Sequence, residues 1–188
     1  MNDKHLVSRR ATCGALLALA LPDVRAQPGA PAEVLAEIPG ARLIGSGRLR
    51  FLGFSVYDVR LWAAQPVLAA EVALRPLALE IEYTRALVGL KIAERSLEEM
   101  RRQQAIAPDV AAGWLAQMAA LFPDVQAGDR LTGKQRPGEA TRFFLNGSLR
   151  GEVRDAEFTK LFFGIWLSPR TSEPALREAL LGPTRATS

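Results

Sequence analysis

The sequence is almost without histidine and cysteine. Its 188 residues include one of each, His5 and Cys13, and both lie near the N-terminus. A chain that loses this stretch has no Ser-His-Asp or Cys-His nucleophile, no zinc site of the usual nitrogen and sulfur ligands, and no disulfide bond. The reactive side chains that remain are Arg, Lys, Tyr, Ser, Thr and the carboxylates, and we expect neither a metal ion nor a cofactor.

Long apolar runs are also missing. The apolar run at residues 11–21 is far shorter than the roughly 20 residues that a membrane-spanning helix needs. Three basic residues precede it, and a Val-Arg-Ala tripeptide that ends at Ala26 offers the small residues that a signal peptidase recognises. We expect residues 1–26 to be a signal peptide that is removed, and residues 27–188 to form a periplasmic domain with no transmembrane segment.

The export route has an alternative. Ser8-Arg9-Arg10 resembles the start of a twin-arginine signal, which would export the protein already folded. The next residues, Thr12 and Cys13, are not the bulky apolar residues of such a signal. The ordinary route is therefore favoured, with the twin-arginine route as the alternative.

The chain has little excess charge of either sign. Its formal net charge is +4, and the first 26 residues hold four basic and two acidic side chains, which leaves +2 for the rest. Basic and acidic residues are interleaved, without a run of Lys or Arg that would follow a phosphate backbone. We therefore expect no nucleic-acid partner. The length that remains suits one domain with its own core.

The first part of this domain has strand-like patterns. Residues 42–62 are punctuated by glycines, and residues 77–84 alternate strictly between apolar and polar side chains. One face of the second segment is therefore apolar, which indicates a sheet with one side on a core. Glu80 and Glu82 share the other face, and we expect both carboxylates to face solvent.

Helical periodicity begins at Val88, where apolar residues recur at every third or fourth position, and it recurs between Pro108 and Pro123. Strand patterns return at residues 129–134 and 141–145. Asn146-Gly147, directly after them, predicts a two-residue hairpin turn.

The C-terminal part is helical again. Asp155 and Ser172 are expected to cap its two helices, and Gly182-Pro183 is expected to end the second. Strands and helices are thus grouped in blocks along the chain, which is typical of an α+β domain with an antiparallel sheet.

Several segments, taken in order, resemble the chalcone isomerase-like family in its bacterial exported branch. They are Gly45-Ser46-Gly47, Phe51-Leu52-Gly53, Val56-Tyr57-Asp58, Leu79-Glu80-Ile81-Glu82-Tyr83, Ala93-Glu94-Arg95-Ser96, Glu99-Met100, Phe122-Pro123-Asp124-Val125, Gly128-Asp129, Phe143-Phe144-Leu145-Asn146-Gly147 and Phe163-Gly164-Ile165-Trp166-Leu167-Ser168. The resemblance implies a chalcone isomerase-like fold: an antiparallel β-sheet with helices packed on one face and a ligand cleft between. It also implies a divided family, in which some members cyclise a chalcone and others bind fatty acids or have no known catalysis.

The isomerase or lyase activity is one alternative. Cyclisation is an attack by an already acidic phenol oxygen, so a guanidinium and a hydroxyl network suffice without histidine. On a chalcone-like or enolisable phenolic substrate, Arg48 or Arg50 would stabilise the enolate and Tyr57 would donate a hydrogen bond. The resemblance places the family's catalytic threonine at Tyr57, and its tyrosine and asparagine near Val88 and Arg95. The catalytic set is therefore not kept, and we assign no catalytic residue.

The fatty-acid-binding branch, by the same resemblance, pairs an arginine with a tyrosine at the threonine position. Tyr57 occupies that position, with Arg48 or Arg50 as its partner, and a guanidinium with a phenol suits a carboxylate. We therefore expect a non-catalytic protein that binds a fatty acid or another small hydrophobic carboxylate. A second alternative is a cleft filled by side chains in a domain that binds a protein partner.

Overall fold

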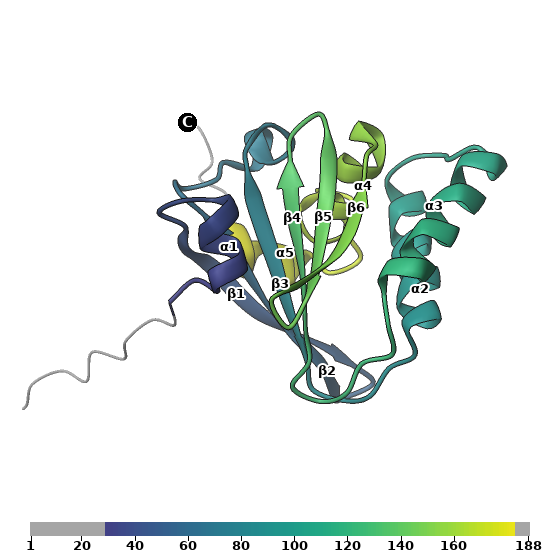
Figure 1. The fold of residues 1–188 in the computed structure, drawn as a ribbon, viewed down its shortest axis with the longest axis horizontal. Helices are drawn as coiled ribbons and strands as arrows, with labels where there is room; N and C mark the ends of the chain where they lie inside the picture. The colour runs from purple at the N-terminus through teal and green to yellow at the C-terminus, as the bar shows by residue number, and fades with distance from the viewer. Residues whose placement is uncertain (1–28, 183–188) are drawn as a thin grey trace, which may run out of the picture.

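The computed structural model describes residues 29–182, so the expected signal peptide lies outside the described residues. The described chain forms a six-stranded antiparallel sheet in which the strand order follows the chain (Figure 1). The strands are β1 (Arg42–Phe51), β2 (Phe54–Ala63), β3 (Leu77–Tyr83), β4 (Arg130–Arg136), β5 (Ala140–Leu145) and β6 (Ser148–Val153). The helices are α1 (Ala32–Glu37), the 3-10 helix η1 (Ala69–Leu74), α2 (Gly89–Gln103), α3 (Pro108–Leu121), α4 (Ala156–Leu167) and α5 (Pro174–Leu181).

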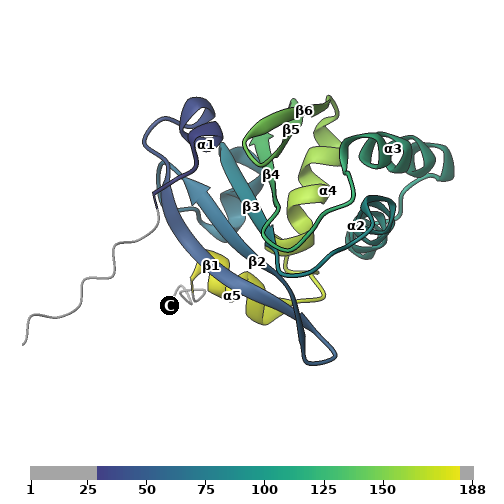
Figure 2. The same cartoon turned by 60° about the horizontal axis from the view of Figure 1, so that its bottom comes forward.

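Helices α2 to α5 pack over one face of the sheet, and the main core lies between (Figure 2). Successive side chains of a strand point to opposite faces, so each strand contributes alternate residues to this core. Leu77, Leu79, Ile81 and Tyr83 of β3 all lie in it, as the alternation predicts. Helix α4 is the most buried, with nine of its 12 residues inside. No helix within residues 29–182 is long and apolar enough to span a membrane.

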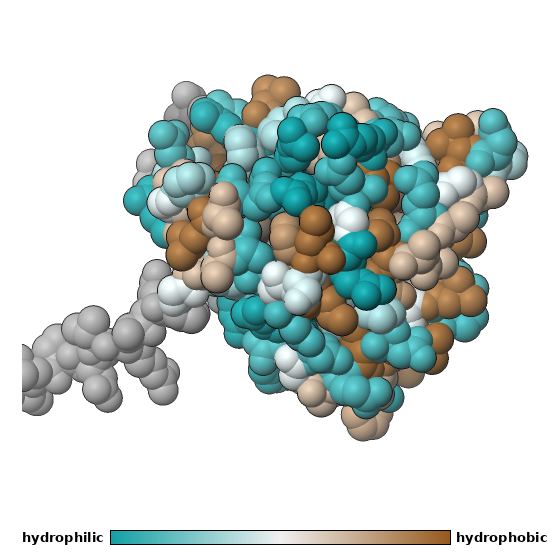
Figure 3. All heavy atoms as spheres, viewed as in Figure 1, coloured by the Kyte–Doolittle hydropathy of each residue, from teal (hydrophilic) through white to brown (hydrophobic). Residues whose placement is uncertain are grey.

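The opposite face carries a smaller core under α1. Val34 and Ile38 of this helix pack on Trp62 and Ala78 of the sheet. The sequence patterns did not predict α1, because six residues contribute too short a period to recognise. Around it, this face is largely hydrophilic, as Figure 3 shows.

Glu80 lies on this α1 face but does not face solvent as expected. Its side chain is 3% exposed, and it accepts hydrogen bonds from Trp62 Nε1 at 2.7 Å and Arg60 Nη1 at 3.0 Å. Because α1 covers Trp62, the carboxylate beside the indole is removed from water with it. Glu82, whose side chain is 37% exposed, does reach solvent as predicted.

Two hairpins turn through residues with positive φ. Asn146 and Gly147, at φ 49° and 87°, make the predicted turn between β5 and β6. Leu52 and Gly53 join β1 to β2 at φ 49° and 82°. This conformation is ordinary for Asn and Gly but unfavourable for a residue such as leucine.

Of the two helix caps predicted from the sequence, one is present. Asp155 Oδ1 accepts from the backbone N–H groups of Glu157 and Phe158 at 2.8 and 2.9 Å, which caps α4 as predicted. Ser172 does not cap α5, because the hydroxyl of Thr171 accepts the backbone N–H two residues later instead.

Helix α5 lies against β1 at a distance that only glycine permits. A Cβ atom on Gly45 would lie 2.3 Å from the carbonyl oxygen of Leu180. On Gly47 it would lie 2.4 Å from Leu176 Cδ1. The two glycines therefore let the last helix cover the edge strand.

Helices α2 and α3 form an insertion between the neighbouring strands β3 and β4. Leu87 and Val125 exchange two backbone hydrogen bonds, of 3.0 and 2.9 Å, at its base. The Gly89 N–H also donates to Asp124 Oδ1 at 2.9 Å. The two ends of the insertion are thus held side by side.

Candidate ligand site at Tyr57

Tyr57 lies on β2, on the face covered by α2 to α5. Its hydroxyl accepts a 2.9 Å hydrogen bond from Trp166 Nε1 on α4. Tyr83 is its cross-strand neighbour, and the two rings meet edge to face with centroids 6.2 Å apart. The strand alternation that predicted Tyr83 in the core therefore also brings the only two tyrosines of the chain together.

Two polar groups at this place have unused hydrogen-bonding capacity. The Tyr57 hydroxyl accepts from Trp166, but its own proton has no acceptor within residues 29–182. Glu99 of α2 is 6% exposed, and its Oε1 accepts from Arg95. Its Oε2 has no hydrogen-bond partner in the described chain, since Arg102 Nε, 3.5 Å away, is at ion-pair distance only.

The environment keeps both tyrosines neutral. Burial raises the pKa of Tyr57 to about 12, opposed by the hydrogen bond from Trp166. The negative charges of Glu173 and Glu99 raise the same pKa further, and Arg95 lowers it. Burial, followed by the influence of Tyr57, also raises the pKa of Tyr83. At neutral pH both phenols therefore retain their protons as hydrogen-bond donors.

Arg48 and Arg50, the expected partners of Tyr57, lie on the other face of the sheet. Arg48 is paired across the strands with Asp58, whereas Tyr57 is paired with Leu49. Since neighbouring residues of a strand point to opposite faces, Arg48 and Tyr57 are separated by the sheet itself. The structure thus does not assemble the predicted Arg-Tyr anchor, nor the arginine and tyrosine that the isomerase alternative needs.

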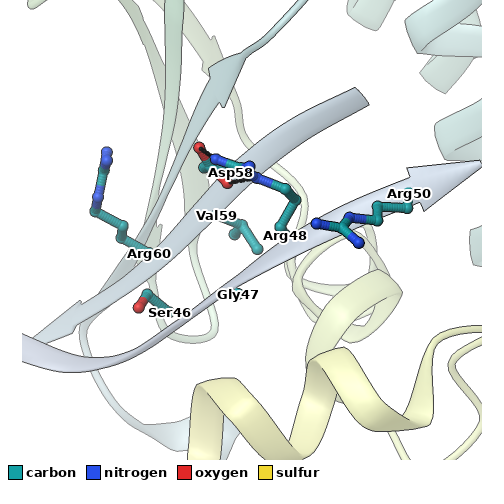
Figure 4. Close-up of a pocket in the computed structure, with 7 residues that line it drawn as sticks. All are labelled: Ser46, Gly47, Arg48, Arg50, Asp58, Val59 and Arg60. Atoms are coloured by element: carbon teal, nitrogen blue, oxygen red, sulfur yellow. Dashed lines mark hydrogen bonds and ion pairs between the residues drawn. The ribbon is translucent and has the colours of Figure 1, made fainter. Parts of the chain in front are cut away.

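The two arginines line a solvent-open hollow of about 390 Å³ on the α1 face (Figure 4). Arg48 turns toward Asp58 and makes a two-pronged ion pair, with distances of 2.6 and 2.8 Å, that lowers the pKa of that carboxyl. Arg50 remains along β1 (Figure 4), without an ion pair in the described chain. A guanidinium already bound to a carboxylate is poorly placed to bind a second one.

Arg95, Glu99 and Trp166 are the residues of this site that sequence reasoning missed as a group. A signal was present, because Ser96, Glu99 and Gln103 are polar residues at helical spacing and all three are buried on α2. Polar residues on the inner face of an amphipathic helix indicate either internal hydrogen bonds or a ligand. Gln103 has the first role, since its Nε2 donates to the Leu161 carbonyl at 2.7 Å.

Aromatic side chains fill the space next to this site. The ring of Phe162 lies 5.1 Å from that of Phe143, 5.6 Å from Phe158 and 5.5 Å from Trp166, measured between centroids. All four residues are buried. A ligand tail that entered between the sheet and the helices would have to displace some of these rings.

Within residues 29–182 there is no group of three or more acidic, histidine or cysteine side chains that could hold a metal ion. The site therefore offers phenol hydroxyls, an indole N–H, a carboxylate and a guanidinium. Groups of these kinds can donate to or accept hydrogen bonds from a polar ligand group.

The fold defines a chalcone isomerase-like protein. The sequence model of that family, described as chalcone isomerase-like, matches residues 40–182, and the chain belongs to this family. The match spans the sheet and all helices except α1.

Two similar proteins are informative. An uncharacterized protein of Haemophilus influenzae is 29% identical over 143 residues, which cover 76% of this chain and 69% of the Haemophilus protein. The crystal structure of the Arabidopsis thaliana fatty-acid binding protein AtFAP1 has a TM-score of 0.59 at 14% identity, covering 76% of this chain and 87% of the Arabidopsis chain. This second likeness shows the shared fold.

Proposed function

We propose that this protein is a non-catalytic binding protein for a fatty acid or another small hydrophobic carboxylate, with the ligand head group at Tyr57. The observation that carries the proposal is the unused hydrogen-bonding capacity of Tyr57 and Glu99 beside an apolar core. Buried polar groups are nearly always paired, so the unpaired oxygen of buried Glu99, near the partly buried Tyr57 hydroxyl, favours a bound molecule. A carboxyl group supplies both partners, since its carbonyl oxygen accepts from Tyr57 and its hydroxyl donates to Glu99.

The presence of Glu99 defines the protonation state of this ligand. A protonated carboxylic acid is the form of the ligand that can both donate to Glu99 and accept from Tyr57. Arg95 bonds to both Glu98 and Glu99, so its charge is already shared between two carboxylates of α2.

The ligand tail requires a movement of the helices. We propose that the α2–α3 insertion moves away from α4 to admit it. Between these elements, Trp114 Nε1 donates to Asp155 Oδ2 at 3.0 Å and Gln103 Nε2 to the Leu161 carbonyl at 2.7 Å. Both bonds are side-chain bonds, which break and re-form without any loss of backbone pairing. AtFAP1, a fatty-acid binding protein with the same fold, supports a fatty acid as the ligand.

The test begins with the chain purified from its native compartment without detergent. Native mass spectrometry, followed by extraction, identifies any bound acid, and titration with palmitic and octanoic acids measures affinity. We expect Tyr57→Phe to weaken binding about tenfold, the effect of one lost hydrogen bond to a charged or strongly polar group. The matched variants Arg48→Ala and Arg50→Ala, on the other face, keep native affinity. Absence of a bound acid together with absence of affinity for either added acid contradicts the proposal.

A protein-binding module is the second candidate function, favoured by the aromatic filling of the interior. In that case the domain binds neither acid, and Tyr57→Phe changes its stability alone. Affinity purification of the native chain, with a partner that co-elutes in a fixed ratio, then supports this second function.

We also propose that residues 1–26 direct export to the periplasm. The basic start, the short apolar run and the small residues before position 27 support this location. Cell fractionation and N-terminal sequencing test it, with Gln27 as the expected first residue of the exported form. A chain that remains in the cytoplasm with Met1 intact contradicts it.

A further inference from the structure

The β1–β2 hairpin extends beyond the rest of the domain as a two-stranded ribbon (Figure 2). The pairing of β2 with β3 ends at Tyr57 and Tyr83, whereas β1 and β2 remain paired as far as Phe51 and Phe54. Residues 51–54 therefore have no third strand beside them. They form the hairpin tip, and three of the four are large apolar residues.

The apolar side chains of the hairpin tip face water. Phe51, Leu52 and Phe54 are 67%, 81% and 68% exposed, among the highest values of any large apolar residue described. Isolated exposed apolar residues are common, but three around one turn form a patch.

Leucine is also an unusual choice for the backbone at this turn. Leu52 has φ 49°, the same value that Asn146 has at the corresponding position of the β5–β6 turn. Asparagine and glycine are favoured there, and leucine is strained. Strain that the fold does not need is commonly found at functional positions. The β5–β6 turn shows that this chain uses the favoured residue elsewhere.

Basic and hydroxyl side chains lie next to the tip. Ser55, Thr84 and Arg85 line a solvent-open hollow of about 380 Å³ together with Phe54. Arg50 lies on β1 directly before the tip. Neither Arg50 nor Arg85 makes an ion pair within residues 29–182, whereas Arg48 nearby is neutralised by Asp58. The hollow thus offers an unpaired guanidinium and two hydroxyls, which suit a phosphate group.

We propose that the hairpin tip docks on the surface of a membrane that contains anionic phospholipids. Phe51, Leu52 and Phe54 enter the boundary between head groups and acyl chains, while Arg50 and Arg85 bind lipid phosphates. A lipid surface fits better than a protein partner because the patch is small and convex, whereas a stable protein interface buries about 800 Å² on each side. A membrane needs no complementary surface, and the insertion of each apolar side chain contributes favourable free energy independently of the others.

The experiment measures flotation of the chain from Gln27 onward with vesicles of phosphatidylcholine alone and of phosphatidylcholine with phosphatidylglycerol. This chain retains every described element and lacks the apolar run of residues 11–21. We expect binding to the anionic vesicles, and a loss of about tenfold or more in the double variant Leu52→Asn with Phe54→Ser. Leu52→Asn suits the turn, so the fold is kept. Leu149→Ser, at a 52% exposed leucine on another hairpin, is the matched control and binds as the native chain does.

The basic residues beside the hairpin tip have their own test. Arg85→Gln removes most of the preference for phosphatidylglycerol, and raising the salt concentration has the same effect. Phe54→Trp gives a blue-shifted emission on vesicle binding, because the native Trp62, Trp114 and Trp166 are buried already. The proposal is overturned if the native chain floats with neither kind of vesicle, or if the tip variants float as the native chain does. It is also overturned if the chain binds inorganic phosphate but no vesicle.

Docking requires no ligand at Tyr57, so its outcome is separate from that of the proposed function. Tyr57→Phe floats with vesicles as the native chain does, and the tip variants keep native affinity for fatty acids in solution.

Discussion

Trp166 donates its indole N–H to the hydroxyl of Tyr57 across 2.9 Å, and this bond joins α4 to β2 over 109 residues of sequence. It is the polar connection between the most buried helix and the sheet at the candidate ligand site. The buried indole N–H of Trp166 needs an acceptor, and the Tyr57 hydroxyl supplies it. The proton of that hydroxyl remains available to donate to another molecule. The bond therefore has both a stability role and a binding role, which substitutions can separate.

Tyr57→Phe leaves the Trp166 N–H without its acceptor. We expect the free energy of unfolding to fall by about 1–3 kcal/mol, the cost of an unsatisfied buried donor. Trp166→Phe removes the donor instead, and the double variant loses less than the sum of the two single variants. Urea denaturation of the four proteins measures this coupling, and additive losses would show that the bond contributes nothing.

The two tyrosines predict a loss of stability in alkali. The pKa of Tyr57 is raised to about 12 in the folded protein, above the value of about 10 in an unfolded chain. The folded state therefore holds a proton that the unfolded state releases, so stability is complete below about pH 10 and falls as the pH rises toward 12. We expect Tyr57 to contribute roughly 1–3 kcal/mol of this loss. Denaturation at several pH values checks it, with Tyr57→Phe showing the shallower decline and phenolate absorbance absent from the folded protein near pH 10.

Glu80→Ala removes the acceptor of the Trp62 N–H and of Arg60 in a site where Glu80 is 3% exposed. We expect a destabilisation of about 2–4 kcal/mol, since breaking a buried charged pair leaves its partner uncompensated. Glu82→Ala, which breaks an exposed ion pair to the same arginine, costs below about 1 kcal/mol. Thermal and urea denaturation compare the two, and equal losses would contradict the burial of Glu80.

Gly45→Ala places a Cβ atom 2.3 Å from the backbone of Leu180, so α5 must move away from β1. We expect a loss of about 2 kcal/mol or more from this overpacking. Gly113→Ala, in α3 with nothing within 4 Å, instead stabilises the protein by about 0.5–1 kcal/mol. Melting temperatures of the two variants should thus move in opposite directions.

Glu99→Gln tests the protonated ligand head group in the proposed complex. In the native protein, affinity for octanoic acid rises as the pH is lowered, because the acid must carry its proton to donate to Glu99. The glutamine variant carries no charge there and binds with little dependence on pH. Calorimetric titration near pH 5.5 and near pH 7.5 measures both, and identical pH profiles would exclude Glu99 from the site.

The sequence predicted the elements of this fold well. Strict alternation in β3, helical periodicity in α2 and α3, the Asn146-Gly147 turn and the Asp155 cap are all confirmed. Each depends on interactions within a few residues, where local sequence is decisive. The placement of Tyr57 in a strand follows from the same kind of pattern.

Which face of β1 and β2 meets the helices could not be predicted in the same way. Both faces of β2 are partly apolar, because α1 covers Trp62 on one side while α2 to α5 cover Val59 on the other. Arg48 and Arg50 share one face, as alternation predicts, but alternation does not say that Tyr57 lies opposite. The burial of Glu80 has the same origin. It depends on α1, a six-residue helix that lies far from Glu80 in the sequence but packs on the same face of the sheet. For this reason the structure does not bring the expected Arg-Tyr pair together.

The closed base of the α2–α3 insertion has an evolutionary consequence. Leu87 and Val125 hold its ends so close that the sheet on either side would be continuous with a short turn in its place. A change in the length of these helices therefore need not shift the register of any strand. Arg95 and Glu99 reside on this inserted segment, and Tyr57 on the sheet. One contiguous segment of the chain therefore carries Arg95 and Glu99 and can change without a change in the sheet that carries Tyr57.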